Sequence, residues 1–246
     1  QRFALKWRKA GKKIGFVPTM GYLHDGHLSL VRRARKSVGP HGIVVVSIYV
    51  NPTQYDDPDD LAKYPRPLDE DLQKAAAAGA DLAFLPAYDD LYADDYRFRI
   101  SEHQLSRELE GARREGHFDG VLTVVLKLFG IVRPDRAYFG EKDWQQLQLV
   151  RDMASAFFLD LEIVSCPTLR EADGLAMSSR NVRLTPTERK IAPELHRTLT
   201  SGLATGEMEA TLREAGFEVD YVERRGNRVL GAVRLGEVRL IDNVKA

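Results

Sequence analysis

Short apolar runs alternate with amphipathic segments along residues 14–165. Five runs have the length and apolar character of buried strands, and they cover residues 14–17, 42–50, 81–85, 137–139 and 161–165. Helical spacing of apolar positions separates them, at residues 28–37, 67–78, 123–132 and 144–157. Strands that alternate with helices predict an α/β fold with a doubly wound parallel sheet, which is a Rossmann-like arrangement. In such a sheet, ligands bind at the carboxyl ends of the strands.

The pattern changes after residue 170. Residues 186–200 and 207–215 have helical spacing, whereas 217–224, 228–235 and 238–242 read as short strands separated by glycine-containing turns. We therefore expect a Rossmann-like ligand-binding domain over residues 1–170 and a small α+β lid domain over residues 171–246. Residues 171–181 would form the hinge between them. A basic amphipathic stretch at residues 1–13 predicts a helix ahead of the first strand, without the pattern of a signal peptide.

Charge and cysteine content exclude several classes of protein. The 246 residues contain 36 Lys and Arg against 36 Asp and Glu, so nothing indicates a general affinity for nucleic acid or for an anionic membrane. The single cysteine, Cys166, ends an apolar run, and we interpret it as a small core residue in a protein of the reducing cytosol. No apolar stretch approaches the length of a membrane span.

The decamer PTMGYLHDGH, residues 18–27, lies where the first strand turns into a helix. Free backbone N–H groups and the positive end of the helix dipole face an anion at such a turn. His24 and His27 are three residues apart on one side of the first helical turn, and Gly26 lets a ligand approach the backbone. Surface histidines or a pair of zinc ligands are the alternatives, but no matching second pair of zinc ligands is evident. The decamer favours the binding of nucleotide phosphates, although it is neither a Walker loop nor a dinucleotide fingerprint.

Two further polar clusters follow predicted strands. Residues 51–54, NPTQ, offer neutral amides that suit hydroxyl and carboxylate groups, or else form a turn held by its own side chains. Residues 140–143, GEKD, combine a glycine, a mobile cation in Lys142 and a carboxylate in Asp143 that can take a ribose hydroxyl, or else form a capped helix start. Both clusters fall at the same edge of the predicted sheet as the decamer.

Three weaker patterns complete the candidates. Residues 177–181, MSSRN, follow a flexible glycine-containing segment and suit an anion clamp, or an ordinary serine-rich loop. Residues 113–120 form either a loop over the site or a charged surface turn. The acidic run 69–71 predicts a helix cap, in which Glu70 and Asp71 are candidates for a magnesium shell.

Seven segments in order along the chain resemble those of the pantoate–β-alanine ligase (pantothenate synthetase) family: PTMGYLHDGH, NPTQY, YPRPLDED, EGHFDGV, YFGEKDWQQ, READGLAMSSRN and RLIDN. This family belongs to the nucleotidylyltransferases that share a His-x-Gly-His signature with class I aminoacyl-tRNA synthetases. The resemblance implies that ATP and Mg²⁺ serve to adenylate the carboxylate of pantoate, with release of pyrophosphate. The amine of β-alanine then attacks the adenylate to give pantothenate and AMP. It also implies a cytoplasmic homodimer.

The resemblance assigns roles to particular residues. The ATP-binding positions map onto Met20, Gly21, Tyr22, Leu23, His24, Asp25, Gly26, His27, Gly140, Glu141, Lys142, Asp143, Leu169, Met177, Ser178, Ser179 and Arg180. The pantoate positions map onto Gln54 and Gln146, and Gln54 also faces β-alanine. We expect His24, His27, Lys142 and Arg180 to be the catalytic groups that absorb charge as pyrophosphate leaves.

Two departures and two alternatives stand beside this assignment. Glu115 replaces the proline that usually precedes the Gly-His-Phe turn, and the segment between Asn181 and RLIDN is shorter than the second domain of the family. A class I synthetase fragment would normally carry a basic region that binds tRNA, and none is evident. Another nucleotidylyltransferase that acts on a phosphorylated substrate would need additional cations facing the acceptor, and these are not evident either. A catalytically silent nucleotide-binding module would be expected to lack some of the catalytic groups, but all four are present.

Overall fold

The computed structural model describes residues 1–246. Its contacts divide the chain into two compact units. Unit 1 comprises Gln1–Glu141 and Gln145–Cys166, and unit 2 comprises Lys142–Trp144 and Pro167–Ala246. The sequence pattern predicts the division at residue 170, and the roles assigned to the two parts stay predictions. The same pattern does not reveal that three residues after the fourth strand belong to the second unit.

Unit 1 is built on a five-stranded parallel sheet with the order β3-β2-β1-β4-β5. The strands are β1 (Ile14–Thr19), β2 (Ile43–Ile48), β3 (Leu82–Phe84), β4 (Arg136–Gly140) and β5 (Glu162–Cys166). All five runs predicted as strands are therefore confirmed, and so is the doubly wound α/β class. The strand order reverses between β1 and β4, so the loops after Thr19 and Gly140 leave the sheet at its topological switch point.

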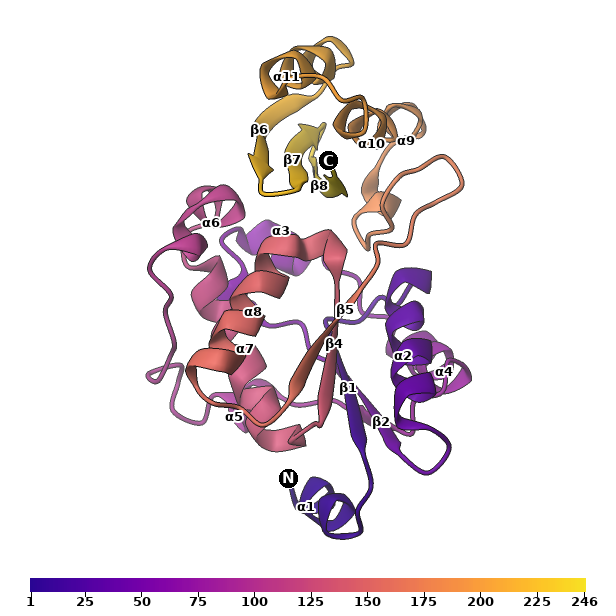
Figure 1. The fold of residues 1–246 in the computed structure, drawn as a ribbon, viewed down its shortest axis with the longest axis vertical. Coiled ribbons are helices and arrows are strands. Elements are labelled where there is room, and N and C mark those ends of the chain that lie inside the picture. Colours follow the sequence, from indigo (N-terminus) through magenta and orange to yellow (C-terminus); the bar gives the residue numbers. More distant parts are fainter. The chain divides into compact units, whose positions relative to one another are not determined.

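Helices cover both faces of this sheet (Figure 1), with α2 (Asp25–Val38) and α4 (Leu68–Ala77) on one face and α7 (His117–Val132) and α8 (Trp144–Ala156) on the other. Alternate strand residues point to opposite faces. Phe16 and Val45 thus belong to the core beneath α7 and α8, whereas Val17 and Val46 belong to the core beneath α2. Both faces of each central strand are buried, which explains the continuous apolar runs in the sequence.

The remaining elements of unit 1 are short. They are α1 (Arg2–Lys9), η1 (Pro52–Gln54), α3 (Pro58–Ala62), α5 (Tyr88–Leu91), η2 (Leu105–Arg107), α6 (Leu109–Arg113) and η3 (Glu141–Asp143), of which η3 lies mainly in unit 2. The helix expected before the first strand is confirmed as α1. The helices α3, α5 and α6 have too few turns for an apolar period to reveal them. α7 begins six residues earlier than predicted, because Gly116 takes a left-handed conformation at φ 73° and sets the helix start at His117.

Unit 2 carries a three-stranded antiparallel sheet with the order β6-β7-β8. Its elements are η4 (Asn181–Arg183), α9 (Pro186–Ile191), α10 (Glu194–Leu199), α11 (Thr205–Glu214), β6 (Glu218–Arg225), β7 (Arg228–Leu235) and β8 (Val238–Lys245). The small α+β unit is confirmed, but the single helix predicted over residues 186–200 is two helices. Pro193 separates them, because it has no N–H to continue the helical hydrogen bonds.

Two predictions about the chain as a whole can be compared with the structure. Cys166 is 2% exposed, and burial raises the pKa of its thiol to about 11, which confirms it as a core residue. None of the helices has the length and apolar character required to cross a membrane.

Candidate active site

The loop between β1 and α2 holds most of the decamer. Gly21 and Tyr22 both have positive φ, at 85° and 52°, so the chain turns sharply after Thr19. The carboxylate of Asp71 on α4 accepts the backbone N–H of Tyr22 at 2.7 Å and that of Leu23 at 2.6 Å. A Cβ at position 21 would lie 2.9 Å from an Asp71 oxygen, so the glycine is required for this close approach. Asp71 therefore fixes the loop by its backbone.

The two histidines of the decamer lie against each other at the start of α2. His24 is the N-cap residue, and its ring centroid is 4.1 Å from that of His27. The Nδ1 atom of His24 accepts the N–H of Gly26 at 3.1 Å, and Nδ1 of His27 accepts the N–H of His24 at 3.5 Å. Since each Nδ1 atom faces a donor, the hydrogen of each neutral ring is on Nε2. The pair therefore provides two Nε2–H donors at a helix N-terminus, where a phosphate is favoured.

The turn after β2 contacts this loop. The Nε2 atom of Gln54 lies 3.3 Å from the sulfur of Met20, so the structure brings together the first two predicted clusters. The Oε1 atom of Gln54 accepts a hydrogen bond of 3.0 Å from Asn51, which is 1% exposed. On the other side of the turn, Gly120 packs so closely that a Cβ there would lie 2.3 Å from the carbonyl oxygen of Thr53. The turn is thus clamped, and Gln54 is its half-buried outer residue.

His117 and Arg114 support the same turn, and neither role was predicted from the sequence. The Nδ1 atom of His117 lies 2.7 Å from the carbonyl oxygen of Gln54, and its Nε2 atom lies 3.2 Å from the Arg114 guanidinium. Arg114 in turn donates to Asp56 at 3.0 Å. Burial, followed by the charge of Arg114, lowers the pKa of His117 to about 4, so its ring is neutral. Within the segment 113–120, His117 and Gly120 are buried against this turn, whereas Arg113 and Glu115 are exposed, so the choice between a loop over the site and a charged surface turn stays open.

The two glutamines at the start of α8 differ in their surroundings. Gln145 is buried, and its amide accepts the N–H of Glu110 at 3.0 Å and donates to the carbonyl oxygens of Leu105 and Glu108. Gln146, the predicted pantoate residue, is half-buried. Gln145 thus has a structural role, and the assignment of Gln146 to pantoate stays a prediction. Gly140 ends β4 and Glu141 begins η3, and a Cβ at Gly140 would meet no atom within 4 Å.

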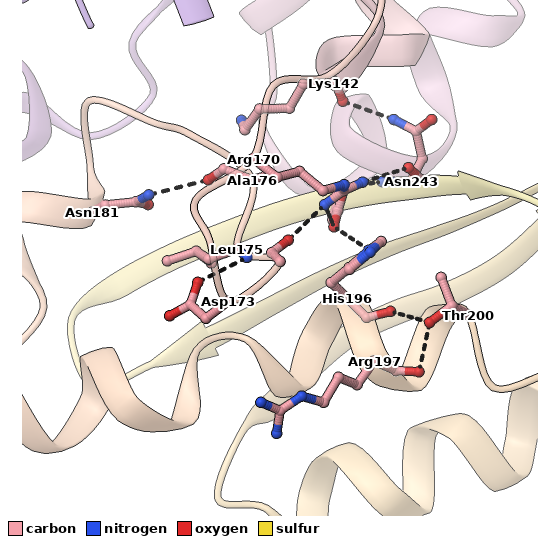
Figure 2. Close-up of polar contacts among 12 residues, drawn as sticks. Lys142, Arg170, Asp173, Leu175, Ala176, Asn181, His196, Arg197, Thr200 and Asn243 are labelled. Carbon is pink, nitrogen blue, oxygen red and sulfur yellow. Dashed lines mark hydrogen bonds and ion pairs between the residues drawn. The ribbon is translucent and has the colours of Figure 1, made fainter. Parts of the chain in front are cut away.

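Unit 2 contains the other predicted ATP contacts. The N–H of Met177 donates to the carbonyl oxygen of Leu169 at 3.0 Å, so residues 169–177 form a closed loop in which these two positions are neighbours. Arg170 and Ala176 form a β-bridge inside it, and Asn181 donates to the Ala176 carbonyl oxygen at 3.1 Å (Figure 2). Gly174 turns the loop at φ 95°. The segment predicted as a flexible hinge is therefore folded onto itself.

The residues that follow this loop form a tight turn. The N–H of Arg180 donates to the hydroxyl oxygen of Ser178 at 3.2 Å, so these two predicted phosphate ligands contact each other, and Ser179 lies between them. Lys142 lies 3.8 Å from the Asp143 carboxylate in the same unit. The predicted roles of these residues toward ATP stay predictions.

Both carboxylates proposed for magnesium have other partners. The two oxygens of Asp71 accept backbone N–H groups, and Glu70 pairs with Lys74 one helical turn away at 2.6 Å. No group of three or more His, Cys, Asp and Glu side chains is arranged to hold a metal ion. Glu70 and Asp71 therefore do not fit a magnesium shell built by the protein.

Comparison with known proteins agrees with this geometry. A model of the family described as pantoate-beta-alanine ligase matches residues 1–245. The pantothenate synthetase of Bdellovibrio bacteriovorus is 56% identical over 238 residues, which cover 97% of this chain and 94% of that protein. The enzyme of that name from Aquifex aeolicus is 43% identical over 271 residues, which cover 100% of this chain and 95% of that protein.

Solved structures show the same relationship. The pantoate-beta-alanine ligase of Francisella tularensis, crystallised in complex with beta-gamma ATP and beta-alanine, superposes with a TM-score of 0.90 at 39% identity and covers 99% of this chain and 94% of its own. The pantothenate synthetase of Thermus thermophilus superposes with a TM-score of 0.87 at 42% identity and covers 98% of this chain and 97% of its own. This chain belongs to the pantoate–β-alanine ligase family.

Proposed function

We propose that the protein condenses pantoate with β-alanine at the expense of ATP. The carboxylate of pantoate attacks the α-phosphorus of ATP, pyrophosphate leaves, and the amine of β-alanine attacks the pantoyl adenylate to give pantothenate and AMP. The observation that carries this proposal is the contact between Gln54 and Met20. It places a neutral amide, suited to a small hydroxy acid, directly beside the histidine loop, which is suited to a triphosphate.

The chemistry asks little covalent help of the protein. Attack on the α-phosphorus needs an in-line pose and donors that stabilise charge moving onto the pyrophosphate. The Nε2–H groups of His24 and His27 would serve as such donors, and the hydrogen bonds that their Nδ1 atoms accept at the N-cap support this assignment. Gln54 and Gln146 would bind pantoate, and Gln54 would also face β-alanine. Because the covalent intermediate forms on the substrate, no nucleophilic side chain is required.

We assign the remaining charge stabilisation to unit 2. Lys142, Ser178, Ser179 and Arg180 would bind the phosphates, together with Leu169 and Met177 against the nucleotide. An Arg180→Lys variant keeps the charge but loses the planar fork of donors, so it should still slow adenylation. Unchanged activity in this variant would remove Arg180 from the proposed clamp.

Magnesium enters this proposal with the nucleotide. Since Glu70 and Asp71 do not fit a protein-built shell, we propose that Mg²⁺ arrives on the phosphates of ATP, as is usual for this ion, and we derive no step through it. We also propose, by analogy with the family, that the protein is a cytoplasmic homodimer. Size-exclusion chromatography with light scattering tests the dimer, and a monomeric mass would contradict it.

Product analysis tests the proposed function. With ATP, pantoate and β-alanine, the protein should form pantothenate and AMP, and omission of pantoate should abolish the release of pyrophosphate. A Gln54→Ala variant should lose affinity for pantoate by roughly 5- to 150-fold while its affinity for ATP stays nearly constant. Release of pyrophosphate with other small carboxylates, but not with pantoate, would indicate a different adenylyltransferase.

A further inference from the structure

Asn243 on β8 holds the backbone of Lys142. Its Nδ2 atom donates a hydrogen bond of 2.9 Å to the Lys142 carbonyl oxygen, across 101 residues of sequence (Figure 2). Both residues belong to unit 2. The Lys142 side chain extends away from the carbonyl group that Asn243 holds. The bond therefore fixes the backbone of Lys142 and does not involve its ammonium group.

Every polar group of Asn243 has a partner. Its N–H donates to Asp242 at 2.7 Å, its carbonyl oxygen accepts from Arg170 at 3.4 Å, and its side-chain oxygen accepts from Arg228. Because a guanidinium can only donate, the amide atom that faces Arg228 must be Oδ1. The atom that faces Lys142 is therefore Nδ2, and the orientation of the amide follows from its surroundings. Asn243 is 3% exposed, so water does not compete for these bonds.

An ion pair between the half-buried Arg170 and the buried Asp242 holds Asn243 in turn. Arg170 donates to both oxygens of Asp242, at 2.6 and 2.9 Å, and also to the carbonyl oxygen of Gly174 at 3.1 Å. His196 lies 3.5 Å from the same carboxylate. Burial alone would raise the pKa of Asp242, but the nearby His196 ring and the hydrogen bonds and charge of Arg170 outweigh it and hold the pKa below its usual value. The strand that carries Asn243 is thus tied to the loop that precedes Met177.

We propose that Asn243 is a positioning residue that acts through Lys142. By fixing the Lys142 carbonyl group, it reduces the range of backbone positions from which the ammonium group approaches the phosphates of ATP. Arg170, Asp242 and Arg228 fix Asn243 itself. The inference rests on the proposed function only in so far as Lys142 meets the nucleotide, and it gives the terminal RLIDN segment a role that its sequence did not reveal.

The test is a double-mutant cycle between Asn243→Asp and Lys142→Ala. The introduced carboxylate would keep an acceptor for Arg228 but place an oxygen against the Lys142 carbonyl oxygen, so this variant removes the one bond at issue. Asn227→Ala, at an exposed turn of the same sheet, is the matched control and should behave as wild type. Circular dichroism and thermal unfolding verify that each variant is folded, and Asn243→Ala serves as a second variant if Asn243→Asp is not.

We expect Asn243→Asp to slow single-turnover adenylation by roughly 10- to 100-fold, the cost of a misplaced charge in the transition state. In the Lys142→Ala background the same substitution should lower the adenylation rate by no more than about twofold, because its effect depends on the Lys142 side chain. Equal losses in both backgrounds would show a general structural role and overturn the proposal, as would wild-type activity in a folded Asn243→Asp protein.

The same cycle can be measured in the dissociation constant of a non-hydrolysable ATP analogue, which requires neither pantoate nor catalysis. Coupling between the two positions supports the proposal, and independent effects overturn it. Coupled analogue binding in a protein that makes no pantothenate would contradict the proposed function and leave the role of Asn243 standing.

Discussion

The hydroxyl of Tyr92 donates a hydrogen bond of 2.8 Å to Oδ1 of Asn51, and this bond orients the side chain of Gln54. The other amide atom of Asn51 faces the carbonyl oxygen of Gly120 at 3.3 Å and must therefore be the donor Nδ2. Nδ2 also donates to Oε1 of Gln54, so Gln54 turns its own NH₂ group toward the sulfur of Met20. A thioether is a weak acceptor, and a substrate oxygen can replace it.

A Tyr92→Phe variant should therefore weaken the binding of pantoate. Loss of one hydrogen bond to the buried Asn51 costs about 1 kcal/mol, so we expect the KM for pantoate to rise roughly fivefold, with the KM for ATP unchanged. Steady-state kinetics with each substrate varied in turn measure both constants. Tyr88→Phe is the matched control, since its ring packs 5.0 Å from that of Tyr92 but its hydroxyl contacts Asp95. Equal effects of the two variants would contradict this role of the Tyr92 hydroxyl.

His27→Ala should slow adenylate formation by roughly 10²- to 10³-fold, because it removes a donor to charge that develops in the transition state. ATP binding should weaken far less. Rapid-quench measurement of pyrophosphate in a single turnover gives the rate, and His41→Ala, at an exposed position before β2, is the control. A rate within about threefold of wild type would remove His27 from the catalytic groups.

The Asp71→Asn variant distinguishes two roles of Asp71, as an anchor of the loop at Tyr22 and Leu23 or as a ligand of Mg²⁺. The introduced amide would turn an NH₂ group toward one of the two backbone N–H donors of Tyr22 and Leu23, so the loop should loosen and ATP binding should weaken by about tenfold. The Mg²⁺ concentration that gives half-maximal activity should stay the same, because Asp71 does not hold the ion. A large rise in this concentration would restore Asp71 to a magnesium shell. Glu70→Gln, which breaks an exposed pair with Lys74, should change neither quantity.

His117 should make the protein less stable in mild acid. Its pKa is about 4 in the folded state, against an ordinary value of 6.5, so between these values the unfolded chain binds a proton that the folded chain does not. The contribution of His117 to the free energy of unfolding is therefore fully present above pH 6.5. It falls by about 3 kcal/mol as the pH is lowered to 4.

His117→Asn checks this prediction, since its amide can still donate to the carbonyl oxygen of Gln54 but does not titrate. Urea unfolding at several pH values should show that wild type loses stability relative to the variant as the pH is lowered from 6.5 to 4. A difference that does not depend on pH would contradict the neutral, buried state of His117.

The sequence predicts the features that depend on local pattern. The alternation of apolar runs and helices identified all five parallel strands, and the strand-to-helix position of His24 and His27 is as expected. These features follow from chain neighbours, since a buried parallel strand and an N-terminal helical turn each leave their mark within a few residues.

The supporting contacts could not be predicted in this way. Asp71 looks like its acidic neighbours Asp69 and Glu70 in the sequence, and only the packing of α4 against the loop brings its carboxylate to Tyr22. Likewise nothing near Asn243 indicates that Lys142 is its partner, because they are joined only in the folded unit. Such pairings depend on tertiary structure. The pattern of a single sequence predicts the elements and the fold class, but not the individual contacts between distant residues.

The transfer of oxygen from pantoate to AMP tests the proposed function most directly. The protein is incubated with ATP, β-alanine and pantoate labelled with ¹⁸O in its carboxylate, and the products are analysed by mass spectrometry. If the carboxylate attacks the α-phosphorus and the amine then displaces AMP at the acyl carbon, AMP acquires a single ¹⁸O atom from pantoate. Pyrophosphate acquires none. Unlabelled AMP, or label in inorganic phosphate or pyrophosphate, would contradict a pantoyl adenylate and with it the chemistry proposed for this site.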